Sequence, residues 1–166
     1  MDDETVRLAL PLLEAGQAQK EMTHNEALAM LDIAVQAVVQ GGPTNQVPDA
    51  PVPGSCWIVG AAPHGAWAGQ AGRLAGWTDA GWRFVRPQPG WRAWDATATQ
   101  EWRLTGSGWE RGTLRGERIM IGEQQVVGTR GAAIADPGGG STIDVEARSV
   151  LAKMLDMLRQ HGLIEA

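Results

Sequence analysis

The sequence is short of the residues that build disulfides, metal sites and membrane spans. Its 166 residues include one cysteine, Cys56, and three histidines that lie in three different segments. A single cysteine excludes an internal disulfide and a zinc site built from cysteines. The chain has no apolar run long enough to cross a bilayer, and its acidic start differs from the basic start of a secretion signal. We therefore expect synthesis and folding in the cytoplasm, without insertion into a membrane.

Positive charge is scarce overall and unevenly placed. The formal net charge is −5, which argues against general binding of nucleic acid. Residues 1–50 carry eight acidic and two basic side chains, whereas residues 70–118 carry eight arginines, no lysine and five acidic side chains. Such a split occurs at contacts between neighbouring copies, but an ordinary solvated surface is the commoner explanation.

Catalytic spacing is missing as well. The sequence contains no HExxH, GxSxG, P-loop or Cys–His pattern. His24 and Glu26 are two residues apart, so on a helix they do not face each other as an acid–base pair needs to. We therefore expect a protein that is not an enzyme and that holds no cofactor or metal.

The aromatic residues are almost all of one kind, with eight tryptophans, one phenylalanine and no tyrosine. All eight tryptophans lie between Gly54 and Gly112, where glycines interrupt the chain every few residues. Pieces such as CWIVG, GWRFVRP and EWRLTG are typical of short strands joined by tight turns. This region therefore predicts a small Trp-rich antiparallel β meander or barrel.

The tryptophans allow two interpretations. Indoles bury a large area each, so they suit the core of a small β-module. Cys56 lies inside the apolar strand pattern CWIVG, and we therefore expect a buried thiol. The functional alternative is a face of exposed indoles that stack on sugar rings. The candidates for such a sugar-binding face are Trp67, Trp77, Trp91 and Trp94.

Two segments outside this region predict helices. In THNEALAMLDIAVQAVVQGGP, a capping box of Thr23 and Glu26 precedes a helical apolar period, and Gly41 and Gly42 end it. A second helix is predicted from about residue 142 to 161, with Gly162 as its C-terminal cap. Between the helices, RIMIGEQQVVG predicts two strands with a turn at Gly122–Glu123.

Together these segments predict an α+β protein in three parts. Residues 1–45 form an N-terminal helical attachment segment, residues 46–112 the Trp-rich β-module, and residues 113–166 a β-extension with a C-terminal amphipathic helix. The apolar face of the terminal helix is wider than one small module covers. We therefore expect a closed homo-oligomer, a trimer or a pentamer, with contacts through Val150, Met154 and Met157.

Polar side chains crowd the stretch GQAQKEMTHNEAL. A helix cap accounts for Thr23 and Glu26, and it leaves five other residues without a local role. Amides beside a helix start suit hydrogen bonds to the backbone of another chain, and the alternative is that they stay solvated. The candidate subunit or particle contacts are Gln17, Gln19, Lys20, His24 and Asn25.

The two ends of the chain carry the most specific motifs. LALPLLEAGQAQKEMTHNEALAMLDIAVQ resembles the opening of a phage-associated family of uncharacterised function, whose members share Q-A-Q-K, T-H-N-E-A-L and L-D. The ending, VVGTRGAAI…LRQHGLI, resembles a pattern found on many phage fibre proteins. The resemblance covers nearly the whole chain, including the Trp-rich region.

This resemblance implies a non-enzymatic virion structural protein, the base or adaptor of a head spike or tail fibre on a phage or gene transfer agent particle. Such a protein aids attachment to the host cell. The implied partners are capsid or tail proteins and a spike or fibre protein, and the implied location is the virion, after synthesis in the bacterial cytoplasm. The alternative is a carbohydrate-binding module that recognises host surface polysaccharide through the Trp-rich region.

Overall fold

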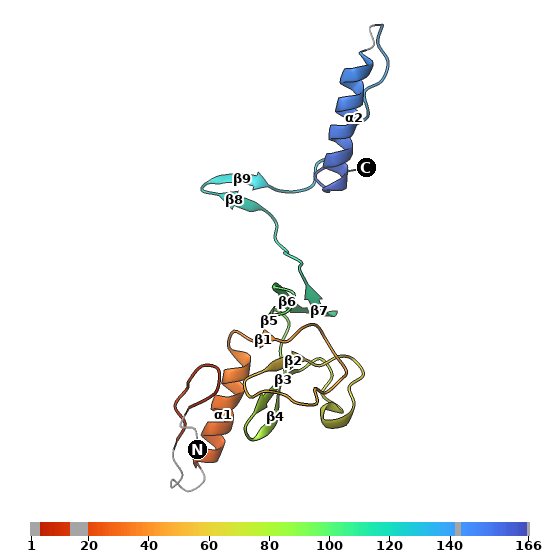
Figure 1. Cartoon of the computed structure of the whole chain (residues 1–166). Helices are drawn as coiled ribbons and strands as arrows, with labels where there is room; N and C mark the ends of the chain where they lie inside the picture. The colour runs from red at the N-terminus through yellow and green to blue at the C-terminus, as the bar shows by residue number, and fades with distance from the viewer. Residues whose placement is uncertain (1–3, 14–19, 142–143, 166) are drawn as a thin grey trace. The chain divides into compact units, whose positions relative to one another are not determined.

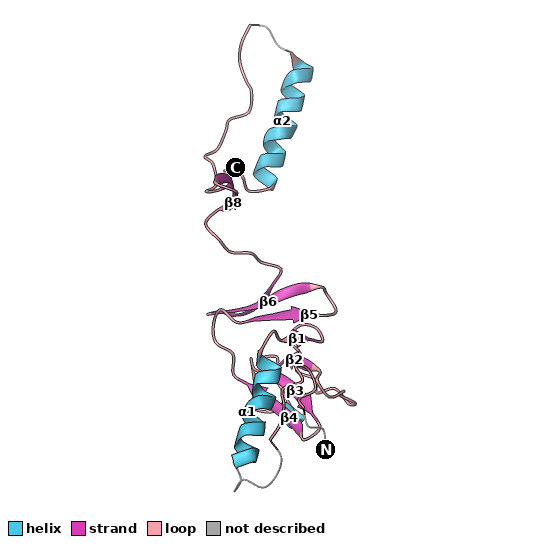
Figure 2. Ribbon diagram, turned by 90° about the vertical axis from the view of Figure 1, so that its left-hand side faces the viewer, coloured by secondary structure: helices cyan, strands magenta, loops and turns pink. Residues whose placement is uncertain are grey.

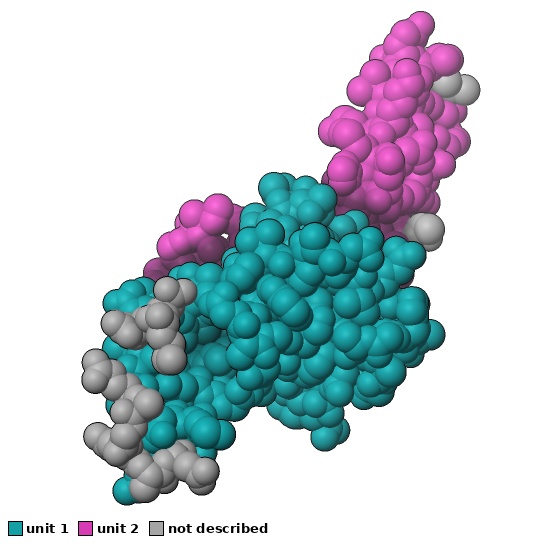
Figure 3. All heavy atoms as spheres, turned by 60° about the horizontal axis from the view of Figure 1, so that its bottom comes forward, with its two compact units in different colours: residues 1–113 teal, residues 114–166 magenta. Residues whose placement is uncertain are grey.

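The computed structural model describes residues 4–13, 20–141 and 144–165, and the chain divides into two compact units. Unit 1 comprises residues 1–113 and unit 2 residues 114–166 (Figure 3). The elements of unit 1 are α1 (Lys20–Ala34), β1 (Val38–Val39), β2 (Cys56–Ile58), the 3₁₀ turn η1 (Gly65–Trp67), β3 (Leu74–Thr78), β4 (Gly81–Val85), β5 (Arg92–Asp95), β6 (Gln100–Thr105) and β7 (Gly108–Arg111). Those of unit 2 are β8 (Ile119–Ile121), β9 (Gln124–Val127) and α2 (Val145–Gln160). The predicted α+β class is confirmed (Figures 1 and 2).

The strands of unit 1 form one sheet in the order β4-β3-β2-β1-β5-β6-β7. The predicted antiparallel hairpins are present on both sides, in the pairs β3–β4, β5–β6 and β6–β7. The sheet as a whole is mixed, because the short central strand β1 runs parallel to both of its neighbours. Val39 pairs with Cys56 of β2, and Val38 pairs with Trp94 of β5. The parts predicted as 1–45 and 46–112 therefore share one sheet.

The first helix differs from its prediction at both ends. It begins at Lys20, so Thr23 lies within the helix and the predicted capping box with Glu26 is wrong. It ends at Ala34, ahead of the predicted stop at Gly41, because Gln36 adopts a left-handed conformation with φ 45°. The β-branched residues Val38 and Val39 then enter the sheet, where strands on both sides satisfy their backbone groups.

Helix α1 packs closely against one face of the sheet, beside β3 and β4 (Figure 1). Its Ile33 joins an apolar cluster with Val39, Ile58 and Leu74, among others. Close approach depends on Gly76 of β3, because a Cβ atom there would overlap the side chain of Ile33. The small residue thus sets the distance between helix and sheet.

Cys56 and Trp67 belong to the interior, as the core interpretation predicts. Cys56 is fully buried, and burial raises the pKa of its thiol to about 11. Trp67 is fully buried in a second cluster with Val59 and Ala75. The ring of Trp67 meets that of Trp82 edge to face, with 5.2 Å between centroids.

Unit 2 contains the hairpin β8–β9 and the helix α2. The predicted turn is confirmed at Gly122, whose φ is 57°. The predicted terminal helix is also confirmed: Asp144 accepts a hydrogen bond from the amide of Ala147 at 2.8 Å, and Gly162 takes a left-handed conformation just past the end. Neither described helix has the length and apolar character that a bilayer crossing requires.

Candidate interaction surfaces

A strap formed by residues 4–13 is fixed to α1 by one buried carboxylate. Asp32 accepts hydrogen bonds from the hydroxyl of Thr5 at 2.8 Å, the amide of Arg7 at 3.1 Å and the amide of Leu8 at 2.6 Å. The Asp32 carboxylate is only 5% exposed, and these three hydrogen bonds replace the ones that water would make to its charge. Asp32, from the L-D motif at residues 31–32, therefore holds the strap against the last turn of α1.

The guanidinium of Arg7 completes this attachment at the C-terminal end of α1. It donates to the carbonyl of Asp32 and, at 2.8 Å, to the carbonyl of Gln36. The carbonyl of Asp32 lies in the last turn of the helix, at the negative end of its dipole, and that of Gln36 lies two residues past the last helical residue, Ala34. A cation held there both satisfies the carbonyls and opposes the dipole.

The candidate contact residues near the start of α1 have different surroundings. The side-chain amide of Asn25 is engaged within the chain, accepting from the amide of Leu13 at 2.9 Å and donating to its carbonyl at 3.0 Å. His24 and Lys20 are both exposed, and the Nδ1 atom of His24 lies 2.9 Å from the backbone carbonyl oxygen of Lys20. Gln17 and Gln19 lie outside the described residues. Lys20 and His24 are thus the members of this set that the structure shows facing solvent.

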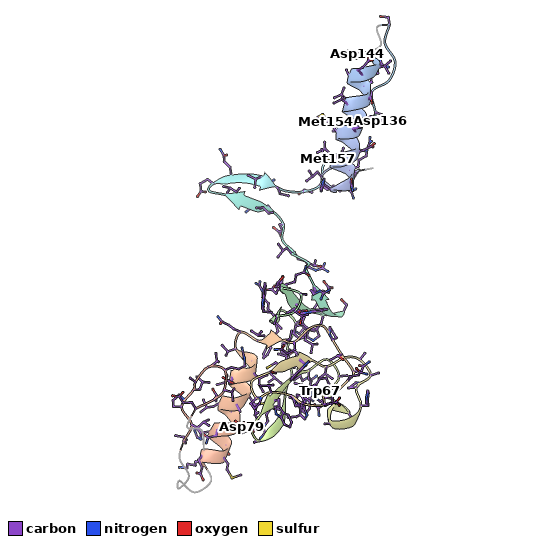
Figure 4. The ribbon with its side chains drawn as sticks, in the orientation of Figure 1. Trp67, Asp79, Asp136, Asp144, Met154 and Met157 are labelled. Atoms are coloured by element: carbon purple, nitrogen blue, oxygen red, sulfur yellow. The ribbon has the colours of Figure 1, made fainter. Side chains whose placement is uncertain are left out.

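A hollow of about 370 Å³ lies between the strap, α1 and the turn that joins β3 to β4. Its lining includes Met22, Trp77 and Arg83, and also Asp79 of the turn, which Figure 4 labels. Arg83 forms an ion pair with Glu26 at 2.7 Å, which links β4 to α1. No local pattern predicts this pair, because 57 residues separate its members.

The four candidate sugar-binding tryptophans do not share one face. Trp67 is buried in the second apolar cluster, and Trp77 is half-buried with its ring centroid 4.9 Å from that of Trp82. Trp91 is half-buried and packs against the first cluster. Trp94 differs from all of these because it is 48% exposed. Among the candidates, it alone offers an accessible indole.

Trp94 lies on an otherwise polar face of β5 and β6, which we call the Trp94 face. Arg92 and Trp94 alternate with buried residues along β5, and they pair across the ladder with Arg103 and Glu101. Arg92 lies 3.4 Å from the carboxylate of Glu101. Beside these residues is a hollow of about 450 Å³ that Arg7 and Gln36 also line. The face thus combines one indole with hydrogen-bonding groups of both charges.

A second buried carboxylate, Asp95, fixes the turn between β5 and β6. It accepts from the amides of Thr97 at 3.0 Å and Ala98 at 2.9 Å, and from the indole of Trp102 at 2.9 Å. Arg111 lies 3.4 Å away. The hydrogen bond from Ala98 contributes most to lowering the pKa of Asp95 below its usual value, against the opposing effect of burial. Asp95 is absent from the candidate residues predicted from the sequence, although an aspartate at the end of a strand is a known turn signal.

The last surface is a stripe on α2 formed by Ala147, Val150, Met154 and Met157 and continued by His161, the C-cap residue just past the helix. We call it the α2 stripe. Val150, Met154 and Met157 are 57%, 53% and 56% exposed. Figure 4 shows Met154 and Met157 on successive turns of the helix. On another side of α2, Arg159 pairs with Asp136 at 3.0 Å and donates to the carbonyl of Ile134 at 2.6 Å. The segment 134–139 thus contacts α2, and the stripe faces solvent.

The described residues contain no group of three or more His, Cys, Asp or Glu side chains that could hold a metal ion. Comparison with known families gives a match to one described as "Protein of unknown function (DUF2793)", over residues 24–110. The chain belongs to the DUF2793 family. The DUF2793 match begins in α1 and ends in β7, so it falls entirely within unit 1. Comparison with curated proteins gives no match.

Proposed function

We propose that this protein is a non-enzymatic structural component of a phage or gene transfer agent particle, the base or adaptor of a head spike or tail fibre. The observation that carries the proposal is that most apolar side chains of unit 2 are exposed. Of its described residues, Ile164 is the one buried apolar side chain, whereas both strands of the hairpin and the α2 stripe are exposed. A unit of this kind is typical of a chain that completes its core by assembly.

The motifs at the two ends support the same proposal. The opening resembles a phage-associated family, and the ending resembles a pattern of phage fibre proteins. The partners we propose are further copies of this chain in a trimer or pentamer, capsid or tail proteins, and a spike or fibre protein. On unit 1, the exposed Lys20 and His24, together with Gln17 and Gln19, are the proposed contacts to the particle.

Electron microscopy of particles from a strain that lacks this protein tests the proposal. We expect particles with intact capsids and tails that have lost one type of projection, and complementation with the unmodified gene to restore it. Particles indistinguishable from the parental ones would refute the structural role.

A second candidate function, recognition of host surface polysaccharide, is favoured by one observation. Trp94 presents about half of its surface next to Arg92 and Glu101, and indole faces flanked by charged and amide groups suit sugar rings. Titration of the purified protein with host polysaccharide, followed by Trp fluorescence, tests it. Saturable quenching that Trp94→Ala abolishes and the exposed control Arg86→Ala retains would establish binding at this face. Unchanged fluorescence at saturating polysaccharide would reject it.

A further inference from the structure

The α2 stripe has the spacing of a coiled-coil seam. Its members alternate at intervals of three and four residues, from Ala147 through Val150, Met154 and Met157 to His161. This alternation keeps the stripe on one line along the 16 residues of the helix, a length of about 24 Å. Helices with such a seam pack side by side, each stripe residue fitting between residues of the neighbour.

The seam is broader than a two-helix contact needs. Leu151 and Leu158 lie immediately beside the stripe on one flank, and Leu151 is exposed. A helix with apolar residues only on the seam is covered by one partner, whereas an extra apolar flank stays in water unless a second partner covers it. The width therefore favours a ring in which each helix contacts two others.

Charge on the opposite flank favours one direction of packing. This flank carries Glu146, Lys153 and Gln160. In an antiparallel pair centred on the helix, these flanks face each other and the lysines at position 153 come close together, which costs energy. In a parallel arrangement, Lys153 instead lies beside Leu158 of the neighbour and covers it with its aliphatic stem.

The hairpin of the same unit provides an independent reason for rotational symmetry. Its apolar side chains Ile119, Ile121 and Val127 are exposed, and an isolated two-stranded hairpin is marginally stable in water. Rotational symmetry along a common helix axis places equivalent hairpins at the same level, where they can cover one another's apolar side chains. A second copy of this chain thus suits both the helix and the hairpin as a partner.

We infer that α2 forms the centre of a parallel, in-register bundle of three or more copies of this chain. The inference deepens the proposed function, on which it rests for the role of the assembly. Its test needs no particle, because the number of copies in the assembly is measured on the purified full chain. A monomer in solution would overturn the inference. The structural role in the particle would still be tested separately, by electron microscopy of particles that lack the protein.

The test compares two adjacent substitutions by light scattering at micromolar concentration. We expect the unmodified chain to have the mass of at least three copies. Val150→Asp places a carboxylate in the seam and should lower the mass at least threefold, to that of a monomer. Ser149→Asp adds the same charge one residue away, outside the seam, and should leave the mass unchanged. Near-ultraviolet circular dichroism of the tryptophans checks that unit 1 stays folded in both variants.

A cysteine introduced at one end of the seam tests whether the α2 helices pack in parallel. In a parallel bundle, His161→Cys brings the introduced thiols together, and mild oxidation should yield a disulfide-linked dimer on a denaturing gel. Antiparallel helices hold these thiols about 24 Å apart, too far for a disulfide. The unmodified chain is the control, because its Cys56 is buried. A mass of one or two copies, an assembly that survives Val150→Asp, or the absence of cross-linking would each overturn the inference.

Discussion

Asp32 and Asp95 are the buried charged residues of the described chain, and each fixes a segment that lies outside the helices and strands. Asp32 fixes the strap to α1, and Asp95 fixes the turn between β5 and β6. In both sites backbone amides supply donors to the carboxylate, so the charge is stabilised by groups that the fold itself places.

Asp95→Asn should destabilise unit 1 by about 1–3 kcal/mol, because an amide nitrogen then faces the donors of Trp102 and Arg111. The pKa of Asp95 is lowered in the folded protein, so its contribution is complete above the unfolded pKa of about 4. It is lost as the pH falls through the lower folded value. The difference in the free energy of unfolding between wild type and variant should therefore shrink below about pH 4.

Urea denaturation followed by Trp emission at pH 7 and at pH 3 measures this difference. Asp79→Asn, in the exposed turn between β3 and β4, is the control and should change stability little at either pH. A loss for Asp95→Asn that is equal at both pH values would show that the charge of Asp95 is unimportant.

Asp32→Ala should release the strap while the sheet stays folded. The amides of Arg7 and Leu8 lose their acceptor, and local opening then costs less free energy. Hydrogen–deuterium exchange of the peptide that contains residues 4–13 should accelerate at least tenfold, whereas a peptide from β3 should exchange as in the wild type. Unchanged protection of the strap would mean that Arg7 and Asn25 alone hold it.

At the scale of elements, the α2 helix and the Trp-rich hairpins were predictable because local signals define them. Asp144 and Gly162 bound α2, and glycine turns separate the strands. The boundary between α1 and β1 was not predictable, because Val35 and Val38 fit a helical period equally well. Neighbouring strands far along the chain decide that Val38 and Val39 join the sheet. Ion pairs such as Arg83–Glu26 were missed for the same reason.

The contact between α1 and the sheet gives a prediction of its own. Gly76→Ala adds a methyl group that overlaps Ile33, so α1 must move away from β3. We expect a loss of about 1–3 kcal/mol in the free energy of unfolding, the usual cost of overpacking a core. Gly106→Ala is the matched control, because a Cβ atom there meets nothing within 4 Å. Thermal denaturation that gives equal midpoints for both variants would contradict the close packing of α1 on β3.

At the scale of the whole molecule, the two units differ in how they satisfy their apolar side chains. Unit 1 has two buried clusters and contains the whole DUF2793 match. Unit 2 lies beyond that match and leaves its helix stripe and hairpin exposed. Periodicity alone predicts that Val150, Met154 and Met157 share an apolar face of the helix. That the face is open to solvent required the structure, because periodicity does not say what covers a helix.

The most direct test of the proposed structural role is reconstitution. Particles from a strain that lacks this protein are mixed with the purified chain, sedimented, and assayed for bound protein. The proposal predicts saturable co-sedimentation at a fixed number of copies per particle, with no binding to particles that already carry the protein. A chain that stays in the supernatant, or that binds both kinds of particle equally and without saturation, would contradict it.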